Sequence, residues 1–229
     1  MTPQIDYSEL EQGSEEWIQA RVGLVTASRC GDVCAMKKNG EEKAERARYR
    51  SELICEILTG QPYPQYVSPE MQWGREQEPF ARAAYEMQRG ILVETCGFIL
   101  HPEIDRFGAS PDFLVGEDGL GQIKCPNLTT HIDWLRAGTV PLEHMPQMVA
   151  EMSCTGREWC DFVSYHPLLP AHLQLFVIRF DRDNRVIGAL ERNVDHFNRE
   201  IDEVLAALPQ KPQGIVLSMD QIAEDEVQF

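Results

Sequence analysis

The sequence predicts a mixed α/β protein in which a mixed central β-sheet is flanked by helices. Segments with helical periodicity alternate with short runs of aromatic and β-branched residues, in the order helices, strands, helix, strands and helix. The 229 residues are 43% hydrophobic and 25% charged, which is ordinary for a globular chain. No internal repeat or low-complexity linker divides them. We therefore predict one domain, residues 1–229, with an irregular acidic tail at about 209–229.

Capping residues and short apolar runs place the individual elements. Ser14 and Ser68 are of the type preferred at a helix N-cap, whereas Gly60 and Gly90 are suited to C-caps. A proline after Ser68 strengthens that helix start. Helices are expected to begin near Ser14 and Thr26 and to cover residues 41–58, 68–89, 128–136, 142–155 and 186–208. Strands are expected at residues 91–94, 97–101, 106–109, 122–125, 159–165 and 173–180.

Charge and cysteine content limit the classes of function. There are 21 Lys and Arg residues against 37 Asp and Glu, so the formal net charge is −16. This sign disfavours nucleic acid as a partner, although a locally basic track is sufficient for a nuclease. No stretch approaches the ~20 apolar residues that cross a bilayer, and residues 1–6 do not resemble a secretory signal. The seven cysteines lack a Cys-x-x-Cys pair, which favours reduced thiols in a cytoplasm over disulfides or structural zinc.

The most informative stretch places a carboxylate and a lysine around one predicted hairpin. Asp112 follows a proline, and Gln122 and Lys124 follow a Gly-Glu-Asp-Gly turn. Residues 122 and 124 of a strand share a face, so the three side chains are expected to converge. The pattern resembles the Pro-Asp…(Asp/Glu)-x-Lys motif of a nuclease superfamily. Taken alone, it is short, and Asp112 is equally compatible with a turn and Lys124 with a solvated strand position.

Further segments resemble the phage lambda exonuclease, or YqaJ-type viral recombinase, family. They are an opening block at residues 17–28, a Trp-Gly…Glu helix at 73–78, a catalytic block at 110–112 and 123–126, and a Pro-Gln-Met sequence at 146–148. Their order and spacing extend over roughly residues 14–180. The resemblance implies the PD-(D/E)xK nuclease fold, in which a mixed sheet is flanked by helices.

The resemblance also implies a catalytic role for individual residues. Asp112, the side chain at position 122 and the backbone carbonyl of Ile123 would hold Mg²⁺, with two ions in each active site and Mn²⁺ as a substitute. Hard oxygen ligands of this kind suit magnesium. Glu78 would approach the metal from its helix, Lys124 would stabilise the reacting phosphate, and Gln147 would position Lys124 or the substrate.

A second group of residues is implied to bind DNA. Arg21, Ser28 and Ser110 would hold a 5′-phosphate, because a guanidinium and two hydroxyls suit that group. Met71 lies where the family places an apolar wedge against the terminal base pair, although a core methionine is an equal alternative. The other residues expected at the DNA are Thr26, Lys37 and Lys38.

Gln122 departs from the family pattern, which has an acid at this position. Glutamine is nearly isosteric with glutamate but uncharged, so the geometry survives while the metal loses one negative ligand. We therefore predict that this chain is inactive or weakly active, although its parent is an enzyme. Both an engineered inactivating substitution and natural variation explain the glutamine.

The predicted function is a magnesium-dependent 5′→3′ exonuclease that digests one strand of linear double-stranded DNA and leaves 3′ overhangs. The resemblance further implies a trimeric ring around DNA, a single-strand annealing protein as partner, and the cytoplasm of a bacterial host. The alternatives are a catalytically inactive DNA-end-binding protein and an endonuclease or nickase on the same fold. An unrelated acidic metabolic enzyme would need a small-molecule motif that the sequence does not show.

Overall fold

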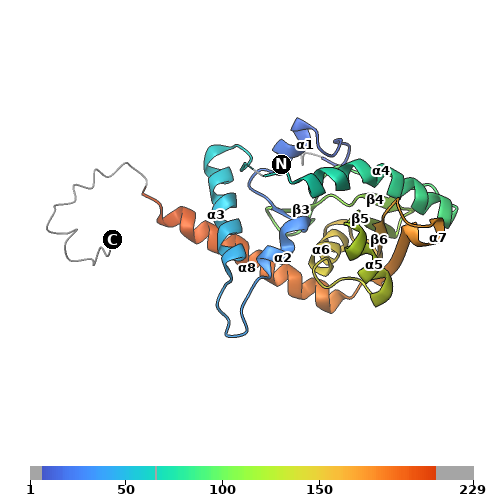
Figure 1. Cartoon of the computed structure of the whole chain (residues 1–229). Coiled ribbons are helices and arrows are strands. Elements are labelled where there is room, and N and C mark those ends of the chain that lie inside the picture. The colour runs from blue at the N-terminus through green and yellow to red at the C-terminus, as the bar shows by residue number, and fades with distance from the viewer. Residues whose placement is uncertain (1–6, 65, 210–229) are drawn as a thin grey trace.

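The structure, a computed structural model, describes residues 7–64 and 66–209 (Figure 1). The helices are α1 Glu15–Ala20, α2 Cys30–Val33, α3 Ala44–Thr59, α4 Pro69–Arg89, α5 Leu128–Ala137, α6 Met145–Thr155, α7 Ala171–Gln174 and α8 Asn184–Ala207, with a 3₁₀ turn η1 at Ala27–Arg29. The strands are β1 Val25–Thr26, β2 Ile99–Leu100, β3 Phe107–Ala109, β4 Phe113–Val115, β5 Gly119–Lys124, β6 Trp159–Tyr165 and β7 Leu175–Asp181. The predicted mixed α/β class is confirmed. The predicted acidic tail lies outside the described residues from position 210 onward.

Local side-chain chemistry explains where the longer helices begin and end. The hydroxyl of Ser68 accepts a hydrogen bond from the first turn of α4, and Gly90 ends this helix at a φ of 65°. Ser14, Asn127 and Asp183 accept the corresponding bonds at the starts of α1, α5 and α8. Each cap satisfies an N–H group that has no partner within its own helix. Within the described residues, no helix is both long and apolar enough to span a membrane.

The strands form two mixed sheets, and helices flank them as predicted. The smaller sheet has the order β1-β3-β2, and the larger has the order β4-β5-β6-β7. In the larger sheet β5 and β6 are parallel, and the two outer pairs are antiparallel. The strand expected at residues 91–94 is reduced to one bridge between Glu94 and Leu114. Elements as short as β1 and β4 contain too few residues to show a periodicity.

The larger sheet is a layer between α4 on one side and α6 with α8 on the other (Figure 1). Side chains alternate across it, as the strand period of two requires. Leu120 and Phe162 pack into the core cluster that includes α6 and α8. Ile123 and Val163 pack with Tyr85 of α4 in a second cluster. Even-numbered positions of β5 therefore face α6.

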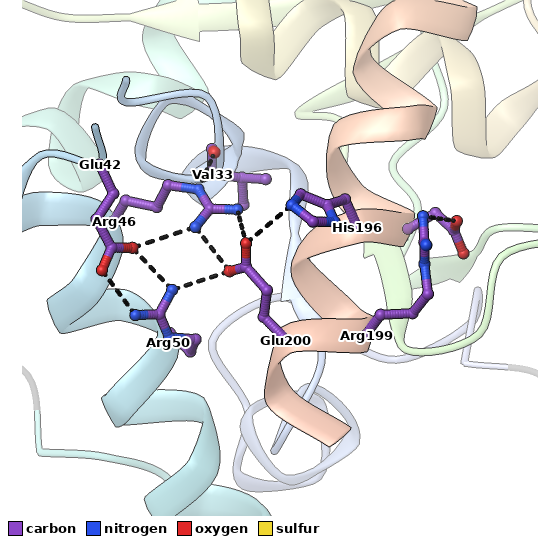
Figure 2. Close-up of polar contacts among 8 residues, drawn as sticks. Val33, Glu42, Arg46, Arg50, His196, Arg199 and Glu200 are labelled. Carbon is purple, nitrogen blue, oxygen red and sulfur yellow. Dashed lines mark hydrogen bonds and ion pairs between the residues drawn. The ribbon is translucent and has the colours of Figure 1, made fainter. Parts of the chain in front are cut away.

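A partly buried ion-pair cluster links α8 to α3 (Figure 2). Arg46, which is only 4% exposed, donates to both carboxylate oxygens of Glu200 at 2.7 and 3.0 Å. Arg50 bridges Glu200 and Glu42, and His196 approaches the same Glu200 carboxylate at 3.1 Å. Two arginines thus hold one carboxylate, which fixes the packing of these two helices.

Candidate active site

The β4–β5 hairpin brings Asp112 and Gln122 together. Asp112 precedes β4, and its backbone N–H donates to Gly121 O at 3.2 Å. A Cβ atom on Gly121 would lie 2.0 Å from the ring of Phe113, so only glycine lets this ring lie against β5. Nε2 of Gln122 then donates to Oδ2 of Asp112 at 2.6 Å. The convergence expected from the sequence is therefore present.

A chain of hydrogen bonds continues from Gln122 to the lysine. Oε1 of Gln122 accepts a bond from Nε2 of Gln147 on α6 at 2.7 Å. Oε1 of Gln147 in turn accepts a bond from Nζ of Lys124 at 3.0 Å. Four predicted residues, Asp112, Gln122, Lys124 and Gln147, are thus joined in one network. Gln122 itself is only 3% exposed, whereas the other three residues are half-buried.

Glu151 is a member of the network that the sequence analysis missed. Nε2 of Gln147 also donates to Oε1 of Glu151 at 2.8 Å. Glu151 is fully buried, and its Oε2 has no hydrogen-bond partner within the described part of the chain. A signal was present, because Glu151 follows Gln147 by four residues and interrupts an otherwise apolar helix segment.

Glu78 lies near this network without joining it. It forms an ion pair with Arg82 at 2.7 Å, one turn further along α4. Its charge nevertheless acts on Asp112, whose pKa is raised to about 7 by burial and then by Glu78, against the opposing effect of Lys124. Burial, together with the Asp112 carboxylate, also raises the pKa of Glu151 well above its usual range. The site therefore holds more negative charge than its own cations compensate.

The available donors fit a magnesium ion in ligand type. Asp112 and Glu151 supply carboxylate oxygens, Ile123 supplies a backbone carbonyl, and Oε2 of Glu151 is buried without a hydrogen-bond donor from the described residues. Such oxygens are the ligands that Mg²⁺ prefers. Among residues 7–64 and 66–209, no group of three or more His, Cys, Asp or Glu side chains is placed to hold a metal. Position 122, where an acid was expected, contributes a neutral amide to this set.

Beside Asp112 lies a cavity of about 160 Å³ that collects the residues predicted to bind a 5′-phosphate. Arg21 lies 3.9 Å over the ring of Trp17, and its Nε is buried without a hydrogen-bond partner in the described chain. The indole N–H of Trp17 donates to Ser110 Oγ at 3.0 Å. The sequence analysis assigned no role to Trp17, yet this residue positions both Arg21 and Ser110. The lining residues are Gln12, Trp17, Arg21, Thr26, Ala27, Ser28, Phe98, Ser110, Asp112, Gln147 and Glu151.

A larger cavity of about 580 Å³ adjoins the first and shares Arg21, Thr26 and Ser28 with it. Met71, 45% exposed, lines this second cavity, so it is not a core residue. Lys37 and Lys38 are exposed on the loop between α2 and α3 and line neither cavity. Lys37 is paired with Glu41 at 2.9 Å.

The fold and the carboxylate–lysine network are those of a PD-(D/E)xK-type nuclease scaffold. Residues 16–158 match the YqaJ-like viral recombinase domain, and the chain belongs to this family. An alkaline exonuclease, LHK-Exo from Laribacter hongkongensis, is 47% identical, with a TM-score of 0.78 over 84% of this chain and 95% of that chain. The structure of LHK-Exo in complex with dAMP is 45% identical, with a TM-score of 0.79 over 84% of this chain and 95% of that chain.

A more distant structure shows the same fold. A phage-related exonuclease from Haemophilus somnus 129PT is 16% identical, with a TM-score of 0.64 over 80% of this chain and 95% of that chain. At this identity the likeness concerns the fold alone. Among curated proteins no match to the chain was found. The family resemblance and the fold predicted from the sequence are therefore confirmed.

Proposed function

We propose that this protein is a magnesium-dependent 5′→3′ exonuclease that digests one strand of linear double-stranded DNA. The observation that carries the proposal is the position of Arg21, which lines the same cavity as Asp112 and whose buried Nε has no hydrogen-bond partner among the described residues. A guanidinium with a free donor is suited to a phosphate. The two structures of the exonuclease LHK-Exo, which are 45% and 47% identical to this chain, support the same class of reaction.

Each residue has a distinct part in the proposed reaction. Arg21, Ser28 and Ser110 hold the terminal 5′-phosphate. Asp112 and the carbonyl of Ile123 hold the metal, which lowers the pKa of water and shields charge on the phosphate when bound. Manganese can replace magnesium in such a site, and two ions would share it. Position 122 presents its amide NH2 to Asp112 and its oxygen to Gln147, so it adds no negative charge to the metal site.

The lysine and glutamine act on the phosphate that is being cleaved. Nζ of Lys124 stabilises its developing negative charge. Gln147 orients Lys124 through the 3.0 Å hydrogen bond between them. Glu78 contributes to the negative field that attracts the cation, since it raises the pKa of Asp112.

The remaining predicted residues would guide the duplex toward the cavity. Met71 and Thr26 line the two adjoining cavities, where Met71 would separate the terminal base pair. Lys37 and Lys38 would contact backbone phosphates further from the end, because they are exposed on a loop outside both cavities.

Gln122 favours a second candidate, a catalytically inactive protein that binds DNA ends. We propose slow cleavage by the chain as written and faster cleavage by Gln122→Glu. Both proteins would be incubated with Mg²⁺ or Mn²⁺ and 5′-phosphorylated linear duplex, with closed circular DNA as a control. Digestion of linear DNA only supports the exonuclease. Cleavage of the circle indicates an endonuclease or nickase, and binding without cleavage by either protein indicates the end-binding protein.

We further propose one nuclease domain for the whole chain, assembled as a trimeric ring in the cytoplasm of a bacterial host. One core cluster draws residues from Val25 to Ile201, which supports a single domain. A ring would let acidic residues face outward while Arg21 faces the enclosed DNA. A single-strand annealing protein would take up the 3′ overhang. Light scattering should give the mass of three 26.1 kDa chains, and a monomer would contradict the ring.

A further inference from the structure

The uncharged side chain at position 122 lies next to a buried carboxylate from another element. Nε2 of Gln147 donates to Oε1 of Gln122 at 2.7 Å and to Oε1 of Glu151 at 2.8 Å. The Gln147 nitrogen thus forms a bridge between the side-chain oxygen of Gln122 and the carboxylate of Glu151. The two side chains reach this nitrogen from β5 and from α6, respectively.

Only one of the two carboxylate oxygens of Glu151 has a hydrogen-bond partner among the described residues. The residue is fully buried, and Oε2 accepts no hydrogen bond from the described residues. Leaving a buried polar atom unsatisfied costs free energy, and the penalty is larger for a charged group. The lysine of the network, Lys124, donates to Gln147 rather than to Glu151. This oxygen therefore has no cationic partner in residues 7–64 and 66–209.

Glu151 also lines the cavity that contains Asp112. Two carboxylates that line one cavity are stabilised together by a divalent cation between them. Oε1 of Glu151 is fixed by Gln147, which leaves Oε2 as the oxygen available to such a cation.

We propose that Glu151 is the second acidic ligand of the metal that Asp112 binds, and that it supplies from α6 the carboxylate that β5 lacks at position 122. This inference rests on the proposed function, since it assigns a further ligand in the same site. Gln147 is a positioning residue for this ligand, because its amide holds Glu151 and Gln122 at once. The slow cleavage expected of the Gln122 chain then depends on Glu151.

The test measures Mn²⁺ binding to the full chain by electron paramagnetic resonance, independently of cleavage. Glu151→Gln keeps the shape and removes the charge, and Glu143→Gln, at an exposed position before the same helix, is the matched control. Changing groups that merely support a ligand weakens metal binding about 10- to 100-fold, so Glu151→Gln should weaken it at least that much. Glu143→Gln should leave it unchanged.

The exchanged double variant Gln122→Glu/Glu151→Gln returns the carboxylate to β5. Mn²⁺ affinity should recover in this variant to within a few-fold of the parent, and circular dichroism would establish that each variant is folded. If Glu151→Gln is unfolded, the double variant must still bind Mn²⁺ as the parent does. Unchanged Mn²⁺ affinity in folded Glu151→Gln overturns the inference and leaves the nuclease proposal standing. If neither the parent nor Gln122→Glu binds Mn²⁺ or cleaves DNA, the proposed function itself fails.

Discussion

Nε2 of Gln122 donates a 2.6 Å hydrogen bond to Oδ2 of Asp112, and the backbone N–H of Ile123 donates to the same oxygen. These two donors stabilise the Asp112 carboxylate from within the protein. A glutamate at position 122 would place a second negative charge at the same point, where the two acids repel each other unless a cation lies between them. The residue at 122 thus decides how strongly the site requires a metal.

Asp112 is predicted to be indispensable for cleavage. In the Gln122→Glu background, Asp112→Asn should lower the cleavage rate by at least ~10²- to 10³-fold, as expected for the loss of one preorganised electrostatic group. Calcium should support end binding without turnover, because its longer and less regular coordination differs from that of Mg²⁺. Rates would be measured on 5′-phosphorylated linear duplex. A folded Asp112→Asn variant that retains most of its rate would contradict the assignment.

Arg21 is predicted to discriminate between chemical forms of the DNA end. A hydrogen bond from a charged group is worth about 1.5–3 kcal/mol, which corresponds to roughly one to two powers of ten in rate. In the active background, Arg21→Ala should slow digestion of 5′-phosphate ends by this factor and affect 5′-hydroxyl ends much less. Arg48→Ala, at an exposed position on α3, serves as the control. Equal loss on both ends would show that Arg21 does not bind the terminal phosphate.

The parts of the fold that the sequence predicted are those set by local chemistry. Ser68 and Gly90 fix both ends of α4, and β6 has its predicted bounds because aromatic residues, Trp159, Phe162 and Tyr165, stand at its two ends and its middle. The first strand of the predicted hairpin, β4, was given no bounds because its three residues carry no period. Its pairing with β5 depends on Gly121, whose missing side chain admits the ring of Phe113.

In the candidate site, too, local sequence patterns predict only some of the residues. Asp112 and Gln122 were predicted to meet because one hairpin connects them. Trp17 was not assigned a role, since its contact with Ser110 joins residues 93 positions apart. The isolation of Glu151 Oε2 also arises only from tertiary packing. Sequence spacing therefore finds partners within one hairpin or helix, whereas contacts between distant segments require the folded structure.

The ion-pair cluster in Figure 2 is expected to stabilise the fold at a distance from the candidate active site. Glu200→Gln removes the charge that accepts bonds from the buried Arg46 and from Arg50. Because charged hydrogen bonds contribute about 1.5–3 kcal/mol, the free energy of unfolding should fall by an amount in this range. Asp195→Asn, which breaks an exposed pair on the same helix, should change it by no more than about 0.5 kcal/mol. Urea denaturation would compare them, and equal effects would contradict the structural role.

The lowered pKa of His144 is expected to contribute to the loss of folding stability in acid. Its ring stacks on Phe162 and meets the edge of Trp134, and burial followed by the Lys124 charge lowers its pKa from 6.5 to about 4. As the pH falls below 6.5, the unfolded chain therefore binds a proton that the folded chain does not take up until about pH 4. This difference destabilises the fold across that window. His144→Phe should flatten the decline of Tm between pH 6.5 and 4, and an unchanged slope would exclude this contribution.

Gln122→Glu should accelerate cleavage without a large change in affinity for DNA ends. The new carboxylate would replace the 2.6 Å amide bond to Asp112 with a second charge beside Asp112, while Glu151 retains its place on α6. Restoring one preorganised electrostatic group is worth about 2.7–4 kcal/mol, or ~10² to 10³ in rate. Gln122→Met fills a similar volume without an oxygen and should give no gain, which separates charge from packing. The rate would be followed by the release of nucleotides from linear duplex, and end affinity by fluorescence anisotropy in Ca²⁺. If the Gln122 chain already cleaves as fast as Gln122→Glu, the carboxylate at 122 is dispensable, and position 122 has been assigned the wrong role.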